Sequence, residues 1–134
     1  MKKAIILITI LFSVIILALI INHFRVRHFY VDLKNIESIS LVSIKEDGLD
    51  IKDIDQEKYS LLVENLSSIE FKRYCQDIKS KSDESIEITL KNGNKINVDA
   101  YRRTVYDKNG NIVKVFKEMC NSDAWLRFIE KIKK

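Results

Sequence analysis

The sequence predicts an α+β domain that is attached to a single N-terminal transmembrane helix. Three observations support this fold class: an uninterrupted apolar run at the N-terminus, alternating apolar residues around two Asn-Gly pairs, and two segments with apolar residues at helical spacing. The chain has 134 residues, which accommodates one modest domain besides an anchor. We expect a tail and anchor over residues 1–21, a juxtamembrane linker over 22–33 and a soluble domain over 34–134.

The apolar run covers residues 4–21, and only Thr9 and Ser13 within it are polar. A helix of this length rises about 27 Å, close to the thickness of the hydrocarbon core of a bilayer. A cleaved signal peptide would have a shorter apolar region and small residues before the cleavage site, whereas the three residues before Asn22 are bulky. The run therefore predicts an uncleaved helix whose partner is the lipid bilayer.

The net charge of +4 comes from Lys2, Lys3, Arg25 and Arg27, which flank this run. Residues 31–134 are neutral, with 19 Lys plus Arg and 19 Asp plus Glu. Because the flanking charges nearly balance, the positive-inside rule alone does not fix the orientation. A short tail before a long C-terminal domain is typical of a signal anchor, and it predicts a single-pass protein of the cell membrane with an extracytoplasmic domain. Cations that bracket a membrane span also argue against a nucleic-acid partner.

Segments with β-branched or alternating apolar residues predict the strands of one antiparallel sheet of four to five strands. They comprise residues 36–44, a turn at 46–48, a return strand at 49–51, a strand over 71–76 and the two hairpins described next. The polar, serine-rich residues 78–85 predict a mobile loop.

Loops at residues 91–93 and 108–110 predict two hairpins with G1-bulge turns. A two-residue turn at Asn92-Gly93 would divide the apolar side chains between both faces of the sheet, whereas a three-residue loop keeps them on one face. We therefore expect Gly93 and Gly110 to adopt the left-handed backbone conformation, with positive φ. The expected cross-strand pairs are Ile88 with Ile96 and Ile86 with Val98, then Tyr106 with Ile112 and Val105 with Val113.

Apolar residues at steps of three and four predict two helices that pack on this sheet. Asp53 or Asp55 can cap the first helix, and we expect Ser122 to cap the second. The apolar stripes are Tyr59, Leu62, Leu66 and Ile69 in the first helix, and Trp125, Phe128, Ile129 and Ile132 in the second.

Cys75 and Cys120 are the only cysteines of the chain. In an exported domain an oxidised pair is an expected arrangement, and two separate buried thiols are the alternative. The sequence leaves both open, because it contains no information on the separation of the two Cα atoms.

Charge is distributed unevenly along the domain. Residues 32–70 have ten acidic and four basic residues (net −6), and residues 71–134 have fifteen basic and nine acidic residues (net +6). The two halves either steer a charged partner or face each other across the folded surface. We expect an exposed interaction patch of Tyr101, Arg102, Arg103 and Tyr106, since Tyr and Arg are enriched at interfaces.

The residue types argue against an enzyme. His23 and His28, the only histidines, lie in the linker, where an interfacial belt of aromatic and basic residues is expected, so the domain has no Ser-His or Cys-His pair. Two cysteines without imidazole ligands do not complete a zinc site, and three glycines do not form a phosphate-binding loop. We expect no catalytic residue, no metal and no cofactor.

Several segments together carry a likeness to known proteins: IESISLVSI, YSLLVENLSSI, IEITLKNGNKINVDAY, the strand around Val113, and Cys120 ahead of WLRFI. This layout, over residues 34–132, resembles a family of small uncharacterised domains of Gram-positive bacteria that one N-terminal transmembrane helix tethers. Since that family has no established activity, the resemblance implies architecture and location but no mechanism.

These observations favour a non-enzymatic interaction or sensing module that is tethered to the membrane and binds a membrane or envelope protein. Two other functions stay open. One is an immunity or stress-protection protein against an envelope-active toxin or antibiotic, and the other is a cell-wall hydrolase that uses carboxylates.

Overall fold

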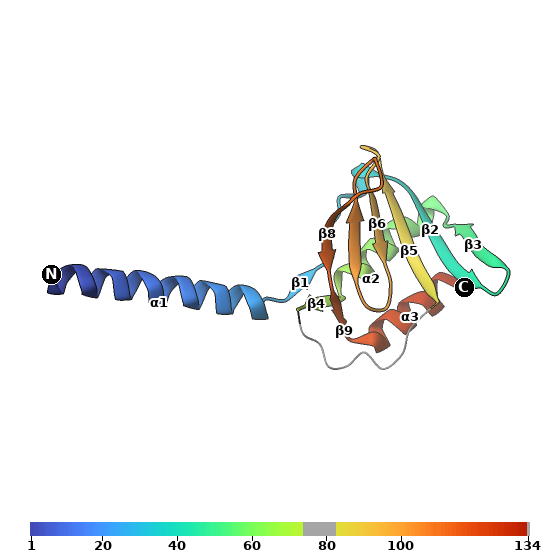
Figure 1. Cartoon of the computed structure of the whole chain (residues 1–134). Helices are drawn as coiled ribbons and strands as arrows, with labels where there is room; N and C mark the ends of the chain where they lie inside the picture. The colour runs from blue at the N-terminus through green and yellow to red at the C-terminus, as the bar shows by residue number, and fades with distance from the viewer. Residues whose placement is uncertain (74–82, 134) are drawn as a thin grey trace.

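The computed structural model describes residues 1–73 and 83–133. It has the predicted α+β architecture, with an apolar N-terminal helix and antiparallel sheets. Helix α1 (Lys2–Phe24) projects from one end of the domain (Figure 1). Its mean hydropathy reaches 3.3 and none of its residues is buried, so it is long and apolar enough to span a membrane.

Six antiparallel strands form the main sheet, in the order β3-β2-β5-β6-β7-β8. Figure 1 shows β8 at the edge near α1 and β3 at the far edge. The prediction of four to five strands is therefore too low. The strands are β2 (Ile36–Lys45), β3 (Gly48–Asp53), β5 (Glu84–Leu90), β6 (Lys95–Val98), β7 (Arg103–Tyr106) and β8 (Ile112–Phe116).

A second, three-stranded sheet has the order β1-β4-β9. It consists of β1 (Arg27–His28), β4 (Glu70–Lys72) and β9 (Glu118–Cys120). Strands of two or three residues are too short for alternation to reveal them, which is why the sequence predicts only the middle one. Residues 22–33 are consequently more than a linker, because β1 joins this sheet and Phe29 is buried in the core.

Two segments of the sequence prediction fall partly outside the described residues. The strand expected over 71–76 corresponds to β4 at its start, and residues 74–76 lie outside the described residues. The loop expected over 78–85 lies outside as far as residue 82, whereas Glu84 and Ser85 belong to β5, where they pair with Ser43 and Val42 of β2.

Helices α2 (Tyr59–Ser67) and α3 (Ser122–Lys133) pack the predicted apolar stripes against one core with the sheets, with Tyr59 and Ile132 only partly buried. Ile69, expected in the first helix, is buried but follows the end of α2. Two short 3-10 helices, η1 (Leu33–Asn35) and η2 (Gln56–Lys58), were not expected. The cap assignments also differ. Asp55 precedes η2 and makes no side-chain capping bond, and Ala124 N donates to Asn121 Oδ1 at 3.2 Å, so Asn121 takes the capping role predicted for Ser122.

The first hairpin has the predicted register, with Ile88 opposite Ile96 and Ile86 opposite Val98. The second hairpin pairs Tyr106 with Ile112 as predicted, but Val105 lies opposite Lys114 rather than Val113. The register shifts between Val105 and Tyr106, because the β8 strand bulges there. Gly93 and Gly110 have φ angles of 89° and 82°, so both are left-handed.

Candidate functional site

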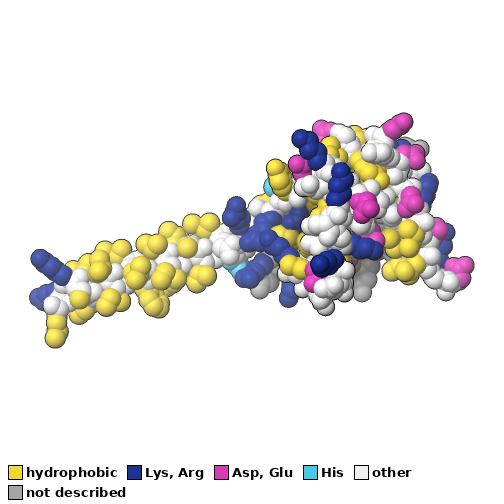
Figure 2. Space-filling model, turned by 90° about the horizontal axis from the view of Figure 1, so that it is seen from above, with side chains coloured by type: hydrophobic (Ala, Val, Ile, Leu, Met, Phe, Trp, Pro, Cys, Tyr) yellow, Lys and Arg dark blue, Asp and Glu magenta, His cyan; other side chains and the backbone are white. Residues whose placement is uncertain are grey.

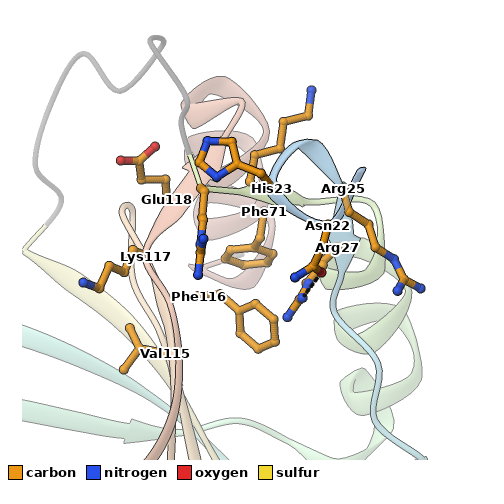
Figure 3. A pocket seen from close by; sticks show the side chains of 11 residues that line it. Asn22, His23, Arg25, Arg27, Phe71, Val115, Phe116, Lys117 and Glu118 are labelled. Atoms are coloured by element: carbon orange, nitrogen blue, oxygen red, sulfur yellow. Dashed lines mark hydrogen bonds between the residues drawn. The ribbon is translucent and has the colours of Figure 1, made fainter. Parts of the chain in front are cut away.

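A basic pocket opens where α1 meets the domain (Figure 3). Its volume is about 460 Å³, which is within the range of small-molecule sites. Three stretches of the chain line it: the end of α1 with the residues that follow, the end of β4, and the connection from β8 to β9. The lining residues are Asn22, His23, Arg25, Arg27, Phe71, Lys72, Arg73, Val115, Phe116, Lys117 and Glu118.

The three-stranded sheet brings these stretches together. Strand β1 pairs with β4, which places Arg27 opposite Phe71. Strand β4 pairs with β9, which places Lys72 opposite Glu118. The pocket therefore depends on strand pairing between segments that are far apart in the sequence.

Positive charge dominates this pocket. Five of its eleven residues are Lys or Arg, and one, Glu118, is acidic. Figure 2 shows Lys and Arg side chains gathered where the helix meets the domain, while most Asp and Glu side chains on this face lie farther from the helix. Within residues 1–73 and 83–133, the ion pairs join other side chains, and no carboxylate pairs with Arg25, Arg27, Lys72, Arg73 or Lys117.

Two contacts orient Arg27. Its Nη2 donates a hydrogen bond to Asn22 Oδ1 at 3.1 Å, and its guanidinium carbon lies 5.5 Å from the centroid of the Phe116 ring. In Figure 3, Arg27 lies beside that ring, whereas Arg25 and Lys117 extend away from the rings on opposite sides. A guanidinium has five N–H donors, so one contact to Asn22 leaves most of them for a ligand.

The aromatic pair of the pocket, Phe71 and Phe116, also contacts a buried arginine, Arg103. Their ring centroids are 6.2 Å apart at an interplanar angle of 52°. The guanidinium carbon of Arg103 lies 3.9 Å from the Phe116 centroid and 5.4 Å from the Phe71 centroid, and Nη1 donates to the His28 carbonyl oxygen at 3.3 Å. The cation–π contacts and this hydrogen bond offset part of the cost of burying the charge.

Arg103 retains its charge at neutral pH in spite of its surroundings. It is only 9% exposed, and burial, together with the nearby charge of Arg27, lowers its pKa to about 10. No acceptor for its Nε lies within the described residues. Phe116 is therefore in contact with two arginines, the half-buried Arg27 and the buried Arg103.

The predicted interaction patch is not one exposed surface. The expectation of exposure is wrong for Arg103, because its register position opposite Val98 faces the core. Arg102 is exposed, since it lies in the preceding turn, and its Nε is 3.6 Å from Asp99 Oδ2. The remaining two members of the patch, Tyr101 and Tyr106, are half-buried.

The two histidines have different positions. His23 lines the basic pocket and packs edge-on against Phe24, with ring centroids 5.2 Å apart. His28 Nδ1 lies 3.0 Å from the Ser67 carbonyl oxygen, and since a carbonyl only accepts, Nδ1 donates. His28 thus joins β1 to the end of α2.

Cys120 is half-buried in β9, opposite Glu70, and it is disulfide-bonded rather than a free thiol. Cys75, its predicted partner, lies outside the described residues, so the pairing itself stays a prediction. Among the described residues, no group of three or more His, Cys, Asp or Glu side chains could hold a metal ion.

The sequence prediction missed the basic pocket, although two of its signals are visible in the chain. Arg25 and Arg27 follow the apolar run, and Lys72-Arg73 is a second basic pair. What joins them is the pairing of β1 with β4, which the sequence does not reveal.

The chain matches no family model, no curated protein and no solved structure. Its resemblance to membrane-anchored domains of Gram-positive bacteria therefore stays a prediction.

Proposed function

We propose that the chain is a non-enzymatic, membrane-anchored binding module that holds an anionic ligand in the basic pocket. The observation that carries this proposal is the set of five Lys and Arg residues in one pocket, at the end of a fully exposed apolar helix. Such residues supply charge and hydrogen-bond donors, which are the groups that hold an anion.

The membrane anchor is proposed from the surface of α1. Its 23 residues give a length of about 35 Å, enough to cross a hydrocarbon core of about 30 Å. Thr9 and Ser13 donate their hydroxyl protons to the carbonyl oxygens of Ile5 and Thr9 at 2.9 Å, so neither hydroxyl needs a polar neighbour in lipid. In water, by contrast, this helix would expose a continuous apolar surface.

We propose that the domain that follows α1 is extracytoplasmic, with Lys2 and Lys3 on the cytoplasmic side of the membrane. A reporter that is active only in the cytosol, fused after Lys134, tests this orientation. The fusion should be inactive, and an active one would reverse the orientation.

Ligand binding is proposed because five cations and a single carboxylate, Glu118, line the pocket, and none of the five is in an ion pair with a carboxylate of the described residues, so like charges lie close together and repel one another. Burial is the main cause of the lowered pKa of Arg103 and the charge of Arg27 adds to it, so the positive charges of these two arginines interact. A bound anion would relieve this repulsion, and in a partly buried pocket the interaction is screened less than at an open surface.

The test uses full-length protein in a non-ionic detergent and pyrophosphate as the anion, at constant ionic strength. Pyrophosphate should raise the unfolding temperature in a saturable way. The double variant Arg25→Gln/Lys117→Gln should lose most of this shift, because both side chains are exposed pocket cations.

The matched control is Lys91→Gln/Lys131→Gln, which removes the same net charge at exposed positions outside the pocket. It should respond to pyrophosphate as the wild type does. A wild type without any shift, or equal shifts in both double variants, would contradict binding in the basic pocket.

A further inference from the structure

Resting on the proposed function, we infer that the ligand of the basic pocket is the phosphate diester of an anionic phospholipid headgroup, taken from the bilayer that holds α1.

The depth of the pocket supports a headgroup. The apolar run ends at Ile21, and Asn22, His23 and Arg25 line the pocket directly after it. At 1.5 Å per residue, Arg25 lies about 6 Å beyond Ile21 along a helix axis. The polar layer on each side of the hydrocarbon core is about 5–8 Å thick, so these residues lie at the level of the lipid phosphates.

The types of side chain fit a phosphate diester. Arg25, Arg27 and Arg73 each offer a planar fork of donors that can bind two phosphate oxygens. The aromatic pair gives the same pocket an apolar part, which suits the glycerol and the first carbons of an acyl chain.

The charge distribution of the domain orients it on an anionic surface. The basic pocket lies at the α1 end, and the acidic residues around the β2–β3 turn lie at the far edge of the main sheet (Figures 1 and 2). An anionic bilayer attracts the first end and repels the second. The acidic residues around this turn are Glu46, Asp47 and Asp50.

The buried Arg103 adds to this argument. Its guanidinium rests on Phe116, which also lines the pocket, and its Nε has no acceptor among the described residues. A phosphate in the pocket would lower the remaining cost of burying this charge, since charges in a protein interior are screened weakly.

The experiment measures lipid binding to full-length protein in detergent by native mass spectrometry, with phosphatidylglycerol and phosphatidylcholine added in equal amounts. The wild type should retain phosphatidylglycerol in preference. The variant Arg25→Gln/Lys117→Gln should bind it about 30-fold more weakly, which corresponds to about 2 kcal/mol for the two lost cations, while Lys91→Gln/Lys131→Gln should match the wild type.

A second measurement places the lipid. In nanodiscs that contain phosphatidylglycerol, amide hydrogen exchange should slow at residues 25–28, 71–73 and 115–118 relative to nanodiscs of phosphatidylcholine alone. Equal retention of both lipids, or phosphatidylglycerol binding that the pocket variant leaves unchanged, would overturn the inference.

Pyrophosphate binding without lipid preference would identify a soluble phosphate compound as the ligand. That result would overturn the headgroup and leave the proposed anion-binding function standing. Absence of both lipid and pyrophosphate binding would overturn the two together.

Discussion

The guanidinium carbon of Arg103 lies 3.9 Å from the centroid of the Phe116 ring, and the same ring has Arg27 at 5.5 Å and Lys114 Nζ at 4.9 Å. One aromatic side chain therefore contacts three cations. Only Arg103 among them is buried, so it is the contact whose removal should affect the stability of the domain most.

We expect Arg103→Ala to lower the free energy of unfolding by about 2–5 kcal/mol, as large-to-Ala substitutions in cores do, because it leaves a cavity among three phenylalanines. Arg103→Met should cost less, since it refills the space and removes a desolvated charge. Denaturant unfolding of the full-length protein in detergent, followed by the fluorescence of Trp125, measures both.

Arg102→Ala is the control for this pair of variants. Arg102 is exposed and its ion pair with Asp99 is at the surface. Arg102→Ala should therefore lower the free energy of unfolding by less than about 1 kcal/mol. If Arg103→Ala and Arg102→Ala lowered the free energy of unfolding by similar amounts, Arg103 would not stabilise the core.

Two turn glycines allow a matched comparison. Both Gly93→Ala and Gly110→Ala place a side chain at positive φ, which costs about 1–2 kcal/mol. Gly93→Ala should cost more, because its new Cβ would lie 3.2 Å from Lys108 Cβ, whereas that of Gly110 meets nothing within 4 Å. The unfolding temperatures of the two variants measure this difference. A larger decrease for Gly110→Ala than for Gly93→Ala would contradict the turn geometry.

A thiol assay of the full-length protein tests the cysteine pair predicted from the sequence. If Cys75 and Cys120 are bonded, denatured protein without reductant has no titratable thiol. Reduction should then lower the free energy of unfolding by up to about 4 kcal/mol, the chain-entropy value for a loop of this size. Two thiols per chain before reduction would exclude the bond, and the variant Cys120→Ala should then differ from the wild type only through packing.

The sequence could predict the elements whose pattern is local. Alternation and a glycine signal determine the hairpin at Gly93, and its register of Ile88 with Ile96 is confirmed. The stripe from Trp125 to Ile129 is likewise buried as helical spacing predicts. In each case the preference of the chain and the packing of the core favour the same arrangement.

The remaining features depend on contacts between distant segments. Strand β1 has two residues, so neither β1 nor the burial of Phe29 leaves a periodic signal. Arg103 has the polar character of a surface residue, and only its register opposite Val98 moves it inward. The basic pocket was missed for the same reason, because pairing of β1 with β4 places Arg27 opposite Phe71.

The turn at residues 107–111 predicts a specific response to acid. Hydrogen bonds lower the pKa of Asp107 below its usual value of 3.8, foremost the one that its Oδ1 accepts from Asn111 N at 2.8 Å. A carboxylate with a lowered pKa in the folded state stabilises that state above pH 3.8, and the contribution disappears as the pH falls through the folded-state pKa.

Asp107→Asn keeps the acceptor oxygen but lacks the charge. It should unfold at a lower temperature than the wild type at neutral pH, and this difference should shrink as the pH falls below 3.8 and through the folded-state pKa of Asp107. Since the hydrogen bonds at this turn hold the second hairpin, Asp107→Ala should unfold at a lower temperature than Asp107→Asn throughout. A difference between the wild type and Asp107→Asn that does not change with pH would show that the charge of this carboxylate has no part in the turn.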